Sequence, residues 1–493
     1  MIKMPDGKLF IGGEWKTGTG EEIVSIFPAD GSLNCSFSGA SRDDVLEAIK
    51  LAKKAQSQSS WLSLKPHERA RYLYSIADGI EANIDRISQI QTRDTGKTLR
   101  ETAALAKSAS ETFRYFGALL ESSDDLLTTQ RNKSLTMSVY EPLGLISAIT
   151  PWNSPIASDA QKVAPALAAG NAVLLKPSSW SPLVSLEFAR IVESAGLPKG
   201  LFSVLPGSGN EIGSLLVDHP DISKVTFTGS TATGRNLAIQ AAKKLMPISL
   251  ELGGKSPVIV FNDSDLDVAI SGVLFGIFSS TGQSCIAGSR LFVQRGIYDE
   301  FLKRLVKATK KLKVGSPYSQ DTQVSTLIHN DHRDSIAAYV DLARNEGAKI
   351  LCGGESPSGA EYKKGAYYLP TIITEVDNSA QISREEVFGP VLVVMPFDDE
   401  ADVIEQANEN EYGLACGIWT SDFPKAWRVG RAINAGTVWV NTYKQFSIST
   451  PFGGEKNSGM GREKGRNGIR AFMSQKSLYF DLTGNSHPWA ETY

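Results

Sequence analysis

Three side chains in this sequence stand out as candidates for chemistry: a thiol, a carboxylate and an amide. Cys285 lies among small and polar residues in SSTGQSCIAGSR, and Gly282 permits an unusual backbone just before it. Glu251 follows an apolar run directly, in SLELGGKSP, where a carboxylate is costly without a role. Asn153 stands between prolines in TPWNSP. A thiol, a carboxylate and an amide brought into one cleft would form a candidate site.

Each of these residues also has a plainer explanation when it is taken singly. A buried cysteine is more often inert packing than a nucleophile. A carboxylate after a strand can serve as a cap or in a buried ion pair, and an asparagine between prolines can simply form a turn. The residues alone leave these alternatives open.

Two further segments have features suited to binding a nucleotide. FTGSTATG (227–234) ends an apolar run, and Gly229 and Gly234 would let backbone N–H groups and a helix N-terminus approach a phosphate. The spacing differs from GxGxxG and the P-loop lysine is absent, so a structural turn is the alternative. Lys176 in LLKPSS ends another apolar run, where it would hold ribose hydroxyls or a phosphate, or be solvated.

Composition argues against several other classes of function. The 493 residues include 51 basic and 54 acidic side chains without long runs of one sign, and the formal charge is −3. We therefore expect neither a nucleic-acid partner nor a membrane partner. Of the five histidines only HNDH (329–332) brings two together, in a polar surround that favours a solvated helix start over a metal site.

The cysteines indicate a reducing compartment. Four cysteines without a CxxC pair form neither a disulfide framework nor a zinc motif. The N-terminal MIKMPDGKLFIGGEW lacks the apolar core of a signal peptide. We expect a cytoplasmic protein.

The elements that must position these residues are two sets of buried strands. From residue 144, short apolar runs alternate with amphipathic segments, first over 144–253 and then from 256–261 to 436–441. Runs with no polar alternation are typical of parallel strands covered on both faces, so we predict an α/β fold with two doubly wound domains. Parallel sheets bind ligands at the carboxyl ends of their strands. The first unit therefore delivers Asn153, Lys176, Gly229 and Glu251 to a cleft, and the second brings Cys285 to its facing side.

Two helices and a pair of exposed strands complete the prediction. Ser41 is expected to cap one helix, and Pro66 to open a second that runs to the turn residues 93–97. The alternating polar and apolar residues of 123–142 and 475–484 predict antiparallel strands that are half exposed or covered by another subunit.

The predicted domain boundaries follow from these patterns. We expect a cofactor-binding domain, a catalytic domain, and an arm with a C-terminal segment, in the ranges 1–122 with 143–253, 254–457, and 123–142 with 458–493.

Seven short motifs carry more information than the pattern of apolar and polar residues does. ITPWNSP, LLKPS, FTGSTATG, LELGGKSP, GQSC, EEVFGPVL and PFGGEKNSGMGRE resemble, in order and approximate spacing over essentially the whole chain, those of the NAD(P)-dependent aldehyde dehydrogenase superfamily. The 34-residue interval from Glu251 to Cys285 matches the family's interval between base and nucleophile.

The resemblance implies oxidation of an aldehyde to a carboxylic acid with NAD or NADP. Cys285 would form a thiohemiacetal, with its oxyanion held by the Asn153 side chain and the Cys285 backbone N–H. After hydride transfer, Glu251 would activate the water that hydrolyses the thioester. Lys162 would take part in a proton relay.

The same resemblance implies the cofactor contacts. Lys176 would hold the adenosine ribose and Glu386 the nicotinamide ribose, and Phe388 would flank the nicotinamide ring. Trp152 and Ser230 would lie along the cofactor, beside Gly229.

Several positions depart from the family pattern. Ser179 replaces the glutamate that often accepts the ribose 2′-hydroxyl, so NADP use is expected alongside NAD. Small residues at Ser154, Ala157 and Ser158 suggest a roomy substrate tunnel, with no charge partner for a carboxylate-bearing substrate. Ser474 stands where many members have a glutamate that assists the relay through Lys162, which puts that role in doubt.

Two alternatives use the same scaffold. A thiol esterase would need Cys285 and Glu251 but no cofactor. A non-catalytic nucleotide-binding structural protein would need neither Cys285 nor Glu251. The exposed β segments resemble the family's oligomerisation arm, so we expect a homodimer or homotetramer acting on a small-molecule aldehyde.

Overall fold

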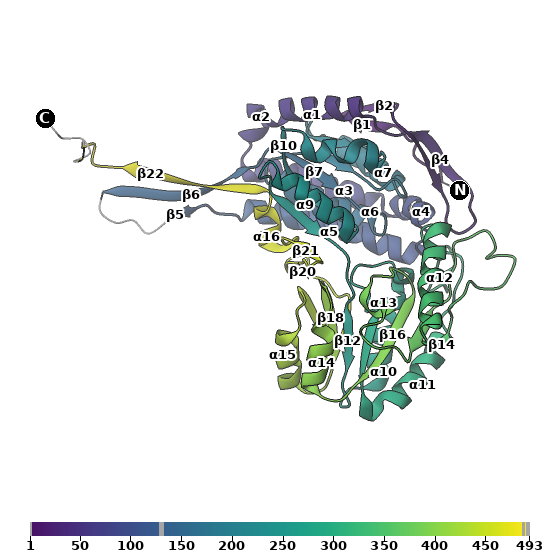
Figure 1. Cartoon of the computed structure of the whole chain (residues 1–493). Coiled ribbons are helices and arrows are strands. Elements are labelled where there is room, and N and C mark those ends of the chain that lie inside the picture. Colours follow the sequence, from purple (N-terminus) through teal and green to yellow (C-terminus); the bar gives the residue numbers. More distant parts are fainter. Residues whose placement is uncertain (1, 128–132, 486–488, 490–493) are drawn as a thin grey trace.

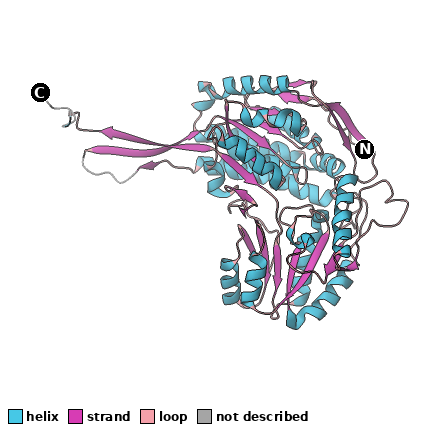
Figure 2. Ribbon diagram, in the orientation of Figure 1, coloured by secondary structure: helices cyan, strands magenta, loops and turns pink. Residues whose placement is uncertain are grey.

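The computed structural model describes residues 2–127, 133–485 and 489. Two α/β bodies lie next to each other, and a long antiparallel arm projects from the first (Figure 1). Helices cover both faces of each sheet (Figure 2), which confirms the predicted doubly wound fold.

The first sheet has eight strands in the order β2-β1-β9-β8-β7-β10-β11-β21. Its five central strands are parallel. The strands are β1 (Leu9–Ile11), β2 (Glu14–Lys16), β7 (Leu145–Ile149), β8 (Ala172–Lys176), β9 (Phe202–Val204), β10 (Ile222–Thr228), β11 (Ile248–Glu251) and β21 (Gly459–Met460).

Side chains of the central strands alternate between two cores. In β7, for example, Ile146 and Ala148 enter one core while Leu145 and Ile149 enter the other. The helices and turns around this sheet are α1 (Arg42–Gln56), α2 (Ser59–Leu62), α3 (Pro66–Ala82), α4 (Ile84–Thr95), α5 (Leu99–Glu121), α6 (Pro155–Ala168), α7 (Leu183–Ser194), η1 (Gly209–Gly213), α8 (Leu215–Asp218), α9 (Thr231–Ala242) and α16 (Gly465–Arg470).

Of the two predicted helices, the structure confirms the start of the first and divides the second in two. Ser41 caps α1 in a capping box with Asp44, as expected. The single long helix predicted after Pro66 is wrong, because the chain breaks at Asn83 into α3 and α4. The Asn83 side-chain amide donates to the Gly79 carbonyl at 2.8 Å, so a side-chain bond competes with the helical ladder there.

The second sheet has seven strands in the order β14-β15-β16-β13-β12-β18-β19, and all its pairs are parallel except β14–β15. The strands are β12 (Pro257–Val260), β13 (Arg290–Gln294), β14 (Lys349–Cys352), β15 (Thr371–Thr374), β16 (Val391–Phe397), β18 (Ala415–Trp419) and β19 (Thr437–Val440). The helices and turns are α10 (Leu266–Phe278), η2 (Ser279–Gly282), η3 (Arg295–Ile297), α11 (Tyr298–Thr309), α12 (Asn330–Asn345), α13 (Gln381–Arg384), α14 (Glu400–Asn408) and α15 (Phe423–Ala432).

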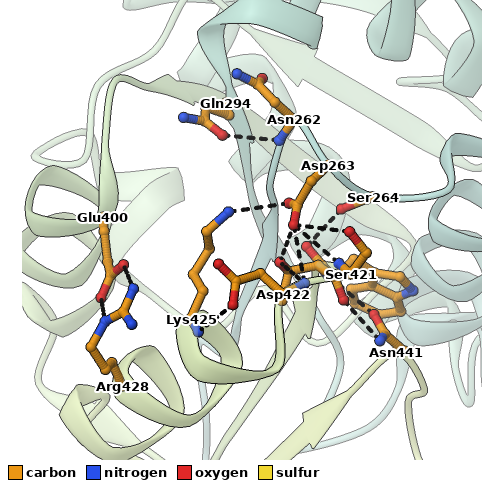
Figure 3. A network of polar contacts seen from close by, with 12 residues as sticks. Asn262, Asp263, Ser264, Gln294, Glu400, Ser421, Asp422, Lys425, Arg428 and Asn441 are labelled. Carbon is orange, nitrogen blue, oxygen red and sulfur yellow. Dashed lines mark hydrogen bonds and ion pairs between the residues drawn. The ribbon is translucent and has the colours of Figure 1, made fainter.

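A polar network closes the carboxyl edge of this second sheet (Figure 3). Asp263, just beyond β12, accepts hydrogen bonds from Thr420, Ser421 and Asp422 beyond β18, and pairs with Lys425 at 3.3 Å. Burial opposes ionisation of Asp263, but these partners outweigh it and lower the pKa of its carboxyl group. The network ties the end of β12 to the end of β18, at the carboxyl edge where such sheets often bind ligands.

The arm is a three-stranded antiparallel sheet, as the alternating pattern predicted. Its strands are β5 (Leu126–Leu127), β6 (Ser134–Pro142) and β22 (Met473–Asp481). Residues 128–132 of the predicted strand region lie outside the described residues.

The segment that joins the second body to the last strand of the arm returns to the first sheet. Its strand β21 pairs with β11, and Ile469 of its helix α16 enters a core of the first sheet. Two small hairpins remain, made of β3 (Glu22–Ile26) with β4 (Leu33–Ser38), and of β17 (Tyr412–Gly413) with β20 (Glu455–Lys456). Within the described residues, no helix combines the length and apolarity that crossing a membrane requires.

Candidate active site

The carboxyl edge of the first sheet faces the loop that carries Cys285. Lys176 and Glu251 are the last residues of β8 and β11, Gly229 follows β10, and Asn153 follows β7. Cys285 precedes β13, so it reaches the cleft from the amino edge of the second sheet.

Direct contacts join these segments around the thiol. The Asn153 side-chain amide donates to the Gln283 carbonyl oxygen at 3.1 Å. A Cβ on Gly254, three residues after Glu251, would lie 2.4 Å from the Cys285 carbonyl oxygen, so the two backbones pass in close contact. The Gly254 N–H also donates to Glu386 Oε1 at 2.9 Å. The sequence-predicted thiol, amide, carboxylate and ribose-binding segments therefore converge.

The backbone before the thiol is held in a left-handed conformation. Ser280 and Thr281 have φ of 56° and 55°, and Gly282 has φ of 70°. A Cβ on Gly282 would lie 2.1 Å from the Gly389 carbonyl oxygen. Only glycine can therefore occupy this position where the GQSC and EEVFGP loops touch, and the unusual backbone predicted here is confirmed.

The surroundings of Cys285 favour the protonated thiol. Burial, followed by the negative charges of Glu386 and Glu251, raises the pKa of the thiol to about 12. Lys444 acts in the opposite direction. A thiolate here requires a base or a nearby cation at the moment of reaction.

Glu251 is 5% exposed, and its Oε2 has no hydrogen-bond partner within the described part of the chain. Burial and the negative charge of Glu463 raise the pKa of Glu251 well above its usual value, while Lys162 opposes them. Lys162 donates to Glu463 Oε1 at 2.5 Å and to Thr226 Oγ1 at 3.2 Å. A buried carboxylate with a raised pKa and a free oxygen is suited to accepting a proton.

Glu463 corrects the interpretation of Ser474. Ser474 lies on β22 opposite Glu141, in the arm, whereas Lys162 already has a carboxylate partner in Glu463. The doubt raised at Ser474 about the Lys162 relay was therefore misplaced. Glu463 ends the PFGGEKNSGMGRE motif, so the signal was present in the sequence, but the pairing spans 301 positions.

Three side chains have hydrogen-bonding capacity suited to NAD(P). Lys176 is 6% exposed, and among the described residues its ammonium makes only a long hydrogen bond of 3.4 Å to the Pro177 carbonyl. Burial lowers the pKa of Lys176 to about 8 and raises the pKa of Glu386 to about 7. Ser230 caps α9, whose N-terminus opens toward the cleft side of the sheet. These residues fit a ribose-bearing, phosphate-bearing cofactor.

The Gly229 N–H already donates to the Glu251 carbonyl oxygen at 3.1 Å, and a Cβ at this position would lie 2.4 Å from the Phe227 ring. Ser179 is half-buried in the loop after β8.

An aromatic cluster borders the EEVFGP loop. The Trp152 ring centroid lies 5.3 Å from that of Phe388 and 5.6 Å from that of His332. Phe388 has φ of 54°, and its carbonyl accepts from His332 Nε2 at 2.9 Å. HNDH does begin a helix, capped by His329, but His332 is half-buried and packs against this cluster.

A cavity of about 550 Å³ leads to Cys285 and Asn153. Ser154 and Ala157 line it, in agreement with the roomy tunnel expected from small residues there, whereas Ser158 is buried and is not part of its wall. Its apolar walls are Ala104, Leu105, Phe275, Ile286, Phe446 and Phe452. The expectation that the tunnel holds no charge partner is wrong, because its walls also include Lys97, Arg100, Glu101, Lys444 and Lys464. These residues come from three distant segments, and no local pattern marks them as neighbours.

Comparison with known proteins places this geometry in a family. Residues 15–478 match the group described as "Aldehyde dehydrogenase family". A betaine aldehyde dehydrogenase from Brucella anthropi is 40% identical over 491 residues, covering 99% of this chain and 100% of that protein. One from Bacillus subtilis is 38% identical over 473 residues, covering 96% of each.

Solved structures agree. A betaine aldehyde dehydrogenase from Staphylococcus aureus in complex with NAD+ is 34% identical, with a TM-score of 0.96 over 99% of this chain and 97% of that one. A point mutant of that enzyme, with NAD+ and a BME-modified cysteine, is 35% identical with a TM-score of 0.96 over 98% and 97% of the two chains.

Proposed function

The chain belongs to the aldehyde dehydrogenase family, and from that premise we propose that Cys285 is the nucleophile of its NAD(P)-dependent oxidation of an aldehyde to a carboxylic acid. The reaction consumes the aldehyde, NAD(P)+ and one water, and releases the carboxylate, NAD(P)H and two protons. The observation that carries the assignment is the convergence of the Cys285 loop with Asn153 and the Glu251 segment.

In the first step the Cys285 sulfur bonds to the aldehyde carbon and the thiol proton passes to a base. Glu251, with its free oxygen and raised pKa, is our candidate for that base. The Cys285 backbone N–H and the Asn153 amide would stabilise the oxyanion, and each such donor contributes about 3 kcal/mol.

A bound NAD(P)+ would supply the acceptor for the hydride of the thiohemiacetal carbon. Lys176 and Glu386 would hold its two riboses, and Ser230 with the N-terminus of α9 would lie at its phosphates. Trp152, Phe388 and Gly229 would border it.

In the last step water attacks the thioester at Cys285. Glu251 would take the proton from that water, and the thiol would leave carrying a proton. We assign Lys162 and Glu463 to proton transfer away from Glu251, because their ion pair is buried beside it.

The test is Cys285→Ala, which we expect to abolish both aldehyde oxidation and any ester hydrolysis while NAD(P) binding persists. NAD(P)H formation at about 340 nm and cofactor fluorescence are the readouts. Cys352→Ala is the matched control, because Cys352 is a free, half-buried thiol on β14 that does not line the cavity. Wild-type turnover in Cys285→Ala would remove Cys285 from the nucleophile role.

We further infer a homodimer or homotetramer joined through the arm. The arm exposes apolar side chains, namely Leu126, Leu127, Tyr479, Phe480 and Leu482, and such a surface favours burial against another subunit. The cytoplasmic location stays a prediction, which the four free cysteines support.

A further inference from the structure

The cavity that leads to Cys285 contains more positive than negative charge. Lys97, Arg100, Lys444 and Lys464 line it, against one lining carboxylate, that of Glu101. Lys464 lies near Glu251 and Glu463, whose charges offset its own. Glu101 acts favourably on both Lys97 and Lys444, so a single carboxylate offsets two lysines there.

Lys97 and Lys444 repel each other inside the cavity wall. Lys97 is 4% exposed, and within the described part of the chain the favourable charge acting on it is that of Glu101. Burial first, and then the charge of Lys97, lower the pKa of Lys444 to about 7. Two buried like charges destabilise each other unless an anion lies between them.

Glu101 supplies one negative charge for the two lysines, and the hydrogen bonds that its oxygens accept come from Ser280 and Thr98. Its Oε1 accepts from the Ser280 backbone N–H at 2.6 Å, and its Oε2 accepts from the Thr98 N–H at 3.1 Å and the Thr98 hydroxyl at 2.9 Å. Glu101 therefore secures the start of α5 and the turn before Cys285.

The aromatic walls are already paired with cations of the chain itself. The Lys464 ammonium lies 4.0 Å from the ring centroid of Phe446 and 5.6 Å from that of Phe452, and the Lys444 ammonium lies 5.9 Å from that of Phe275. A quaternary ammonium ligand needs such ring faces for itself. Here it would also meet the charges of the lysines.

We propose that the substrate is an aldehyde that bears an anionic group, such as a carboxylate, at the end remote from the aldehyde, held between Lys97 and Lys444. The inference rests on the proposed function of Cys285. The apolar walls accommodate the body of the substrate, and the exposed Arg100 at the cavity attracts the anion toward it. The preferred substrate then differs in charge from betaine aldehyde, the substrate in the names of the relatives.

The test compares three aldehydes of similar length that differ in terminal charge: 5-oxopentanoate, hexanal and 4-trimethylammoniobutanal. We expect kcat/KM for the anion to exceed that for hexanal by about tenfold or more, and the cation to fall below hexanal by a similar factor. The preference for the anion should shrink as ionic strength rises from about 0.02 M to about 0.5 M.

Variants locate the anion site. Lys97→Met and Lys444→Met should each lower the ratio of kcat/KM for 5-oxopentanoate to that for hexanal by about tenfold. The ratio is insensitive to partial loss of folded enzyme, and Lys97→Glu should bring it below one. Lys107→Met is the matched control, because Lys107 is an exposed residue of α5 outside the cavity wall and should leave the ratio unchanged.

The outcomes separate the two proposals. Oxidation of hexanal as efficiently as the anion, or an anion preference that survives both lysine variants, would overturn the anion site and leave the Cys285 assignment intact. Failure to oxidise any of the three aldehydes with the cofactor bound would overturn the proposed function itself.

Discussion

At the scale of single residues, Ser179 bears on the choice between NAD and NADP. It stands three positions after Lys176, and a carboxylate there would repel a 2′-phosphate. We expect NADP to be at least comparable to NAD in kcat/KM, and Ser179→Glu to shift the preference toward NAD by about tenfold, or about 1.4 kcal/mol. Ser179→Ala, which removes the hydroxyl without adding charge, is the control. A wild-type NADP efficiency about a hundredfold below that of NAD would contradict the prediction.

Lys162 opposes the burial and the Glu463 charge that raise the pKa of Glu251. Its positive charge favours the ionised carboxylate, whereas burial and Glu463 raise the pKa of Glu251. A base is active only above its pKa, so turnover should fall as pH drops through that raised value. Lys162→Met removes the favourable charge, raises the pKa further and should move the acid limb of the kcat profile to higher pH, with Lys107→Met as control. An acid limb at the same pH in Lys162→Met would mean that the two groups are not coupled.

At the scale of elements, the turn η2 positions the thiol. Gly282→Ala would place a methyl group 2.1 Å from the Gly389 carbonyl and strain a backbone with φ of 70°. We expect the Cys285 loop to shift and kcat to fall by about a hundredfold, because small misplacements of a nucleophile are costly. Gly209→Ala is the control, since a Cβ there meets nothing within 4 Å. Unchanged kcat in Gly282→Ala would show that the loop tolerates movement.

At the scale of the whole molecule, the arm is the proposed subunit contact. Phe480→Glu adds a charge to its apolar surface, where Phe480 is 45% exposed, and should shift the mass measured by light scattering toward the 53.3 kDa monomer. Val24→Glu, an exposed strand position on β3, is the control and should keep the wild-type mass. A monomeric wild-type protein would contradict the oligomer.

The sequence by itself determined the features that depend on neighbouring residues, such as buried strands, a helix cap and a tight turn. Apolar runs predicted the central strands of both sheets, because burial on both faces leaves no polar positions in such strands. Ser41 predicted the start of α1, because a cap depends on neighbouring residues. The motif order also predicted the aldehyde dehydrogenase family, and Gly282 the unusual turn before the thiol.

Only the tertiary structure decided which distant charges share a space. Lys162 and Glu463 are 301 positions apart, and the doubt placed on Ser474 arose because sequence spacing does not show that pairing. Lys97 from the loop before α5 and Lys444 from the loop after β19 meet in one cavity, although neither sits in a charged run. The charge of the substrate tunnel was therefore hidden in the sequence, because electrostatic interactions depend on distance and burial, which only the packing of the two bodies establishes.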